Sequence, residues 1–155
     1  MEEIILNSIK DATREITLAF LNMEIKEGPA FIRKDETATQ GSHAETTAIV
    51  GFQGSLSGGV HLAAPLHVAL VLASALADEK IEEFNSEARD AFMEIANMIA
   101  GGVQTKLSED DRAVALVPPI LIHGVNCGMY YREEMKCLRQ YFQTAHGPFF
   151  VQCYY

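Results

Sequence analysis

The hydrophobic period changes along this chain, and the order of the periods limits its fold more than any other feature. Residues 4–25 place apolar side chains at spacings of three and four, which predicts an amphipathic helix that the Gly-Pro pair at 28–29 brings to an end. From Thr46 the pattern alternates with a period of two. Turn residues at 53–59 separate that run from a second one at 60–64, so we expect a β-hairpin.

Helical and extended patterns then follow in turn. Pro65 opens a second helix through Ala77, and Asn85 or Ser86 can cap a third helix that runs through Asn97. The polar segment before the hairpin, 33–43, is loop-like, and the strand-like runs after the third helix are 113–117, 121–125, 128–134 and 141–155. This order of elements predicts an α+β fold, with an antiparallel sheet packed against helices.

Length and charge limit the organisation of the chain and its partners. The chain has 155 residues without a Pro- or Ser-rich linker, so we expect residues 1–155 to form a single domain. Its formal net charge is -9, which argues against nucleic acid because phosphates are bound mainly by Lys and Arg. Most acidic proteins are simply soluble, although a protein partner with a basic surface would suit this charge.

The cysteines and the first residues favour the cytoplasm. The three cysteines form no CxxC pair, and Met1-Glu2-Glu3 has neither the basic nor the apolar region of a secretory signal. The longest apolar stretch, 66–77, is too short to span a bilayer. We therefore expect a cytoplasmic protein without a membrane segment.

Familiar catalytic and metal-binding signatures are missing from the sequence. The turn at 54–58 has Leu56 where a nucleophile elbow has serine, and no glycine-rich phosphate loop occurs. The five histidines are not spaced as metal ligands, and His61 and His123 fall in strand-like runs. The cysteines fit small core or surface positions better than nucleophilic ones. We therefore expect neither a metal nor a cofactor bound by this chain.

The helix at 86–102 carries two stripes of different character. The apolar stripe should face the core, and it consists of Ala88, Ala91, Phe92, Ile95, Met98, Ile99 and Gly102. The polar stripe runs through Asp90, Glu94, Asn97 and Gly101, at steps of four, three and four, so these residues share one face. Glycine is costly inside a helix, so the Gly101-Gly102 pair either ends the helix or allows a partner to approach closely. Spacing alone favours an ordinary solvated face.

This polar stripe resembles the signature of the CheC/CheX/FliY phosphatases of bacterial chemotaxis. The resemblance rests on the pattern Asp90-xxx-Glu94-xx-Asn97-xxx-Gly101, on Pro118-Pro119 downstream, and on the order of the preceding elements. Within that family the chain is more similar to the CheX type. CheC-type proteins usually repeat the motif on the first helix, whereas here Glu15 is followed three residues later by Leu18, which implies one active site. A departure is Gly102, where CheX-like chains often have asparagine.

The resemblance implies a reaction that uses groups of another protein. Its substrate is the aspartyl phosphate of a CheY-like receiver domain, which itself holds the Mg²⁺ ion. Asn97 would orient the attacking water, because an amide donates and accepts hydrogen bonds without titrating. Glu94 would pair with a receiver lysine, while Asp90 and Gly101 would extend the contact. The resemblance also implies a homodimer.

Two other functions stay open on the sequence alone. The first is a non-catalytic module of the same fold that binds a receiver or a flagellar-switch protein. The pair of Glu94 and Asn97 argues against it, because docking alone does not need an amide beside a glycine. The second is an unrelated small-molecule hydrolase or binding domain, for which the sequence offers no constellation of titrating groups.

Overall fold

The computed structural model describes residues 1–33, 45–108, 113–124 and 134–155. The elements in chain order are α1 (Glu2–Leu21), β1 (Lys26–Arg33), β2 (Thr46–Gly54), β3 (Gly58–Ala64), α2 (Leu66–Ala77), α3 (Ser86–Ser108), β4 (Val114–Leu116), β5 (Ile120–His123), β6 (Cys137–Thr144) and β7 (Gly147–Tyr154). The predicted α+β class is confirmed.

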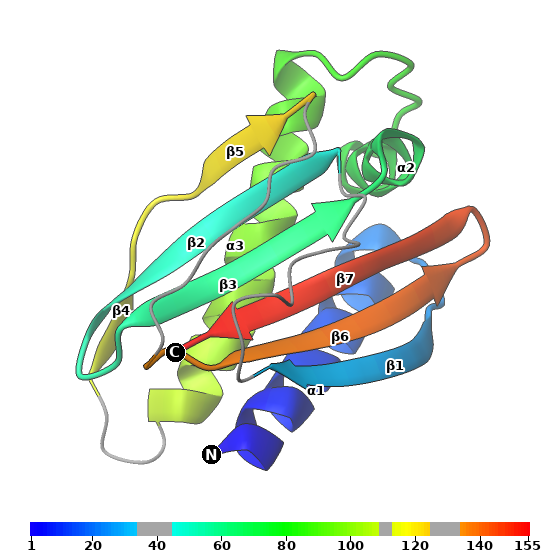
Figure 1. Cartoon of the computed structure of the whole chain (residues 1–155). Coiled ribbons are helices and arrows are strands. Elements are labelled where there is room, and N and C mark those ends of the chain that lie inside the picture. The colour runs from blue at the N-terminus through cyan, green and yellow to red at the C-terminus, as the bar shows by residue number, and fades with distance from the viewer. Residues whose placement is uncertain (34–44, 109–112, 125–133) are drawn as a thin grey trace.

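All strand pairs in the described ranges are antiparallel and belong to one sheet. Its order is β1-β6-β7-β3-β2-β4, and β5 also pairs with β2. Figure 1 shows α1 and α3 across one face of this sheet, with α2 beside the ends of β2 and β3. The helices therefore form a layer on one side, as the sequence predicts for a sheet with one apolar face.

Alternation along the strands determines which side chains meet the helices. Every second residue of a strand points to the same face, and on the central strands this set is apolar. The buried cluster joins strand residues Ala48, Val50, Val60, Leu62, Leu138 and Val151 to Ile5 and Ile9 of α1 and to Phe92 and Ile99 of α3. Each large side chain buried in this way contributes roughly 1.5–3 kcal/mol. The core thus lies between the sheet and the two long helices.

The first helix ends earlier than its sequence suggests. α1 stops at Leu21, where Asn22 adopts a left-handed conformation with φ of 47°. The prediction that the Gly-Pro pair at 28–29 ends this helix is therefore wrong, because the pair lies inside β1. Proline is tolerated there because β1 is an edge strand, and the pairing with β6 is irregular between Glu27 and Ala30.

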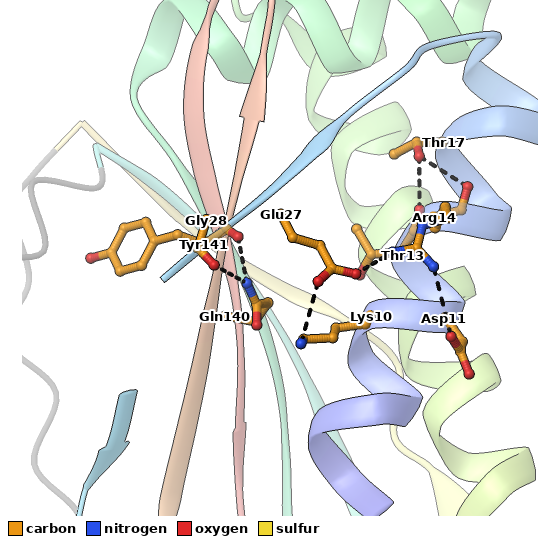
Figure 2. Close-up of polar contacts among 9 residues, drawn as sticks. All are labelled: Lys10, Asp11, Thr13, Arg14, Thr17, Glu27, Gly28, Gln140 and Tyr141. Carbon is orange, nitrogen blue, oxygen red and sulfur yellow. Dashed lines mark hydrogen bonds and ion pairs between the residues drawn. The ribbon is translucent and has the colours of Figure 1, made fainter. Parts of the chain in front are cut away.

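Side-chain contacts attach β1 to α1 and to β6 (Figure 2). Glu27 pairs with Arg14, and with Lys10 at 3.3 Å. From the neighbouring strand, Gln140 Nε2 donates hydrogen bonds of 2.8 Å to the carbonyl oxygens of Gly28 and Tyr141. These contacts are long-range, so local sequence patterns gave no sign of this strand.

The predictions for the hairpin, the second helix and the later strands agree with the structure where it describes them. The hairpin forms from β2 and β3, and α2 begins directly after Pro65. The runs 113–117 and 121–125 contain β4 and β5, and 141–155 holds most of two strands, β6 and β7, joined at Gly147. The predicted strand 128–134 and the loop 33–43 lie almost wholly outside the described residues. In the part of the chain that the structure covers, no helix has the length and apolar composition of a membrane span.

Candidate functional site

The helix that carries the predicted site is fixed at both ends. The backbone N–H of Ala88 donates to Asn85 Oδ1 at 3.0 Å, so Asn85, the first of the two predicted caps, closes the N-terminus of α3. Towards the other end, Gln104 Nε2 donates to the carbonyl oxygen of Val114 in β4 at 2.6 Å. Anchoring of this kind holds side chains on the helix in fixed positions relative to the sheet.

The apolar stripe of α3 faces the core as predicted. Its large members Phe92, Ile95 and Ile99 are at most 1% exposed. Met98 is half-buried and packs against the same cluster. Packing of this apolar stripe into the core therefore sets the rotation of α3 about its axis. The polar stripe consequently points away from the core.

The outer face presents the four predicted site residues together. Asp90 and Glu94 are exposed, and Asn97 and Gly101 are half-buried. None of the side chains of Asp90, Glu94 and Asn97 forms a hydrogen bond or ion pair with another described residue. An amide and two carboxylates are therefore available to an external partner on a rigid helix.

The two glycines of α3 have different surroundings. A Cβ atom added to Gly101 would have no neighbouring heavy atom within 4 Å, whereas one added to Gly102 would lie 2.6 Å from Ala12 Cβ of α1. The helix continues past both to Ser108, which excludes the first of the two explanations for the pair, that it ends the helix. The second explanation, close approach, holds inside the protein for Gly102, which packs against Ala12 of α1. The surface at Gly101 is open to an external partner.

The N-terminal end of α3 is strongly acidic. Glu87 shares a hydrogen bond with Glu79, and this bond together with the Glu79 charge raises the pKa of the Glu87 carboxyl. Asp90 and Glu94 continue the negative charge along the outer face. The face therefore suits a partner that presents positive charge.

Other polar clusters have different roles. No group of three or more His, Cys, Asp or Glu side chains in the described ranges is arranged to hold a metal ion. His61 and His123 lie in β3 and β5, as predicted, and Cys137 and Cys153 are buried in strands. Cys127 lies outside the described residues.

A groove of about 600 Å³ between α1 and the start of β1 is lined by Arg14, Leu18 and Lys26 among others, and contains none of the site residues.

Family comparison gives this helix face its context. The family model described as "Chemotaxis phosphatase CheX" matches residues 46–143, which is more than half of the chain and includes the whole of α3. The chain belongs to the CheX family. This match confirms the family resemblance inferred from the polar stripe of α3, and with it the assignment of the chain to a family of chemotaxis phosphatases. Among curated proteins, none matches the chain.

Solved structures of the family share this fold. A chemotaxis protein CheX from Desulfovibrio desulfuricans is 21% identical with a TM-score of 0.82, over 96% of this chain and 97% of that one. A CheC-like superfamily protein from Shewanella sp. PV-4 is 22% identical with a TM-score of 0.85, over 100% and 99%. The CheX-CheY-BeF3-Mg complex from Borrelia burgdorferi contains a chain that is 22% identical with a TM-score of 0.77, over 96% and 95%.

Proposed function

We propose that this protein accelerates hydrolysis of the aspartyl phosphate on a CheY-like response regulator. The outer face of α3 would insert into the receiver's phosphorylation site, with Asn97 and Glu94 as the catalytic pair. Membership of the CheX family and the similarity to a CheX that forms a complex with CheY support a receiver as the partner. The receiver supplies the phosphoryl group and its Mg²⁺, and we expect no cofactor on this chain.

Asn97 orients the water that attacks phosphorus. Its amide accepts a hydrogen bond from the water and donates another, and it keeps both capacities at any ordinary pH. As the bond from water oxygen to phosphorus forms, the bond from phosphorus to the aspartyl oxygen breaks, and the products are phosphate and a free carboxylate. Positioning the water is the main contribution left to this chain, because the receiver already stabilises the charge.

Glu94 fixes the orientation of the two proteins. It is one helical turn from Asn97 on the same exposed face and has no partner among the described residues. A charge-assisted bond to a receiver lysine would define how deeply the helix enters. Asp90, one turn further, extends this contact, and the open surface at Gly101 admits the receiver backbone.

One observation carries this proposal: the Asn97 amide, which bonds to no other residue in the described ranges, stands beside an open glycine surface on a helix that is anchored at both ends. A polar residue that only improved solubility would not need this space beside it. A non-catalytic docking module would not need the amide. A small-molecule hydrolase would need a concave site, whereas Asp90 and Glu94 lie exposed on the outer face of a helix.

The test measures the lifetime of a phosphorylated receiver with and without the protein. The wild-type chain should shorten the lifetime, and Asn97→Ala should reduce the added rate roughly hundredfold or more while binding is largely kept. The matched control is Asn7→Ala, which removes an exposed asparagine from α1 and should leave the rate unchanged. Wild-type turnover by Asn97→Ala would refute the role of water positioning.

The same assay separates the non-catalytic alternative. A chain that binds the phosphorylated receiver without shortening its lifetime would be a docking module of the family. We further propose that the protein acts as a homodimer in the cytoplasm, where phosphorylated receivers occur. Light scattering of the purified protein would measure its mass in solution, and a monomeric mass would contradict the dimer.

A further inference from the structure

The sheet edge formed by β4 and β5 contains an irregularity with two prolines. Leu116 of β4 pairs with Phe52 of β2, and Ile120 of β5 pairs with Ile49 of β2. Between these two pairs the edge has the three residues 117–119, whereas β2 has only two. The edge therefore carries one extra residue, which makes residues 117–119 a β-bulge, here called the proline bulge. Bulges bend a strand and are frequent next to active sites.

The proline bulge has a fixed conformation and an apolar surface. Its first residue is attached to β2, because the N–H of Val117 donates a hydrogen bond of 2.8 Å to the carbonyl oxygen of Gly51. The next two residues, Pro118 and Pro119, have no N–H, and their rings fix the backbone angle φ. Pro118 is exposed and Pro119 is half-buried. A partner at this point would meet a proline ring whose position is set before binding.

Asn97 lies on the side of α3 that faces this edge. It precedes Gln104 by seven residues, which is two helical turns, so the two side chains lie on the same side of the helix. Gln104 reaches the edge directly, because its Nε2 donates to the carbonyl oxygen of Val114 in β4 at 2.6 Å. Figure 1 shows α3 behind the sheet, between α1 and the edge formed by β4 and β5. Asn97 therefore faces the same edge as Gln104, two turns nearer the start of α3.

The proline bulge also lies at the level of Asn97 along the helix. Contacts at both ends show that α3 and the edge run in opposite directions. Gln104 meets Val114 at one end, and at the other the ring of Phe84, just before α3, lies 4.5 Å from the ring of His123 in β5. Two helical turns span about 11 Å, which equals three to four residues of extended strand. Counting that far along the edge from Val114 leads to the proline bulge.

A receiver bound at α3 must cover more than this helix. A stable interface buries about 800 Å² on each partner, which is a patch roughly 30 Å across. A helix with its side chains is only about 10–12 Å wide. A receiver centred on Glu94 and Asn97 would therefore also cover what flanks α3, and on the Asn97 side that is the proline bulge.

We propose that the proline bulge is a second contact surface for the receiver, next to the residue that orients the water. This inference rests on the proposed phosphatase function. The exposed ring of Pro118 packs against an apolar part of the receiver surface beside the phosphorylated aspartate. Because the ring is already fixed, the contact costs little conformational freedom. Pro118 is thus a positioning residue, which acts on the binding of the receiver and not on the reacting atoms.

The first test locates the contact on the wild-type protein. The labelled protein is titrated with a CheY-like receiver activated by beryllofluoride and Mg²⁺, and its amide resonances are followed by NMR. The amides of Val117 and Ile120 should shift or broaden together with that of Asn97. The amide of Phe31, in β1 at the opposite edge of the sheet, should not change.

The second test measures what the proline ring contributes. Pro118→Ala removes two methylene groups, so the KM for the phosphorylated receiver should rise roughly five- to tenfold while kcat is unchanged. The dissociation constant of the activated receiver should rise by the same factor. The matched control is Pro148→Ala, which changes an exposed proline of β7. Its neighbour Phe149 belongs to the core on the helix side, so Pro148 points to the other face of the sheet, and neither constant should change.

Several results would overturn this contact surface. They are unshifted Val117 and Ile120 amides in a complex that forms through α3, an unchanged KM for Pro118→Ala, and equal effects of Pro118→Ala and Pro148→Ala. If Pro118→Ala does not fold, the NMR shifts of the wild-type protein decide alone. A receiver that binds with shifts at the proline bulge but keeps its full lifetime would refute the phosphatase activity and leave this surface in place.

Discussion

Gly101 and Gly102 are adjacent in the sequence, but they lie against different regions of the molecule. Gly102 is on the side of α3 that packs against α1, where an added Cβ would be 2.6 Å from Ala12 Cβ. Gly101 is on the outer side, where an added Cβ would meet nothing within 4 Å. The same residue type therefore allows helix packing at one position and leaves a surface open at the next.

This difference separates stability from function along one helix. Side chains on the inner side of α3 determine where the helix lies. On the outer side, the side chains of Asp90, Glu94 and Asn97 form no hydrogen bond or ion pair with another described residue. A substitution on the inner side should change the free energy of unfolding, and one on the outer side should change the action on a partner. The following predictions test that separation, beginning with the largest effect.

Gly102→Ala should destabilise the protein. The new methyl group would force α1 and α3 apart, because Ala12 Cβ cannot rotate away. Overpacking typically costs 1–3 kcal/mol, and the better helix propensity of alanine returns about 1 kcal/mol, so we expect a net loss of up to about 2 kcal/mol. Equilibrium urea denaturation would measure it.

A second substitution checks the cause. Ala12→Gly removes the opposing methyl, so the double variant Ala12→Gly with Gly102→Ala should lose less stability than the sum of the two single changes. Strict additivity would mean that the Cβ contact does not produce the effect, and the comparison of the two glycines would lose its structural basis.

The outcome for this glycine pair shows how far sequence reasoning extends. The alternation in 46–64 and the two stripes of α3 predicted the hairpin, the helix and its inner face, because these patterns are local. The continuation of α3 through Gly101 and Gly102 depends on α1 packing against it, which no local pattern contains. β1 was missed for the same reason, since Gly28 and Pro29 are accommodated by pairing with a strand more than a hundred residues later.

The candidate site shows a similar division. Spacing placed Asp90, Glu94, Asn97 and Gly101 on one face, and the structure brings them together there. Spacing alone did not distinguish that face from an ordinary solvated one. The distinction came from the family resemblance, and the roles of Glu94 and Asn97 stay predictions.

On the outer side, Glu94→Gln should weaken binding of the activated receiver without affecting stability. The amide keeps the size of the side chain but removes its charge, so the pair with a receiver lysine loses its charge-assisted character. We expect the dissociation constant to rise about tenfold at low salt, and by less at high salt, where the charge is screened. Isothermal titration calorimetry at two salt concentrations would measure it.

Asp90→Asn is the matched control on the same face. It lies one turn further from Asn97 and should raise the dissociation constant only about twofold, as expected for a peripheral charge. Equal effects of the two substitutions would show general charge attraction by the acidic end of α3. The specific role of Glu94 in orienting the receiver would then be wrong.

Gly101→Ala gives the most selective effect, because stability and function should change in opposite directions. With no neighbour within 4 Å, the methyl group creates no clash inside the protein, and alanine should raise the free energy of unfolding by up to about 1 kcal/mol. If the receiver packs closely on this surface, the same methyl group should raise the dissociation constant of the complex and slow dephosphorylation. Denaturation and receiver lifetime would be measured on one preparation. A variant that is more stable and fully active would show that the partner does not use the space beside Asn97, and Gly101 would then have no part in the site.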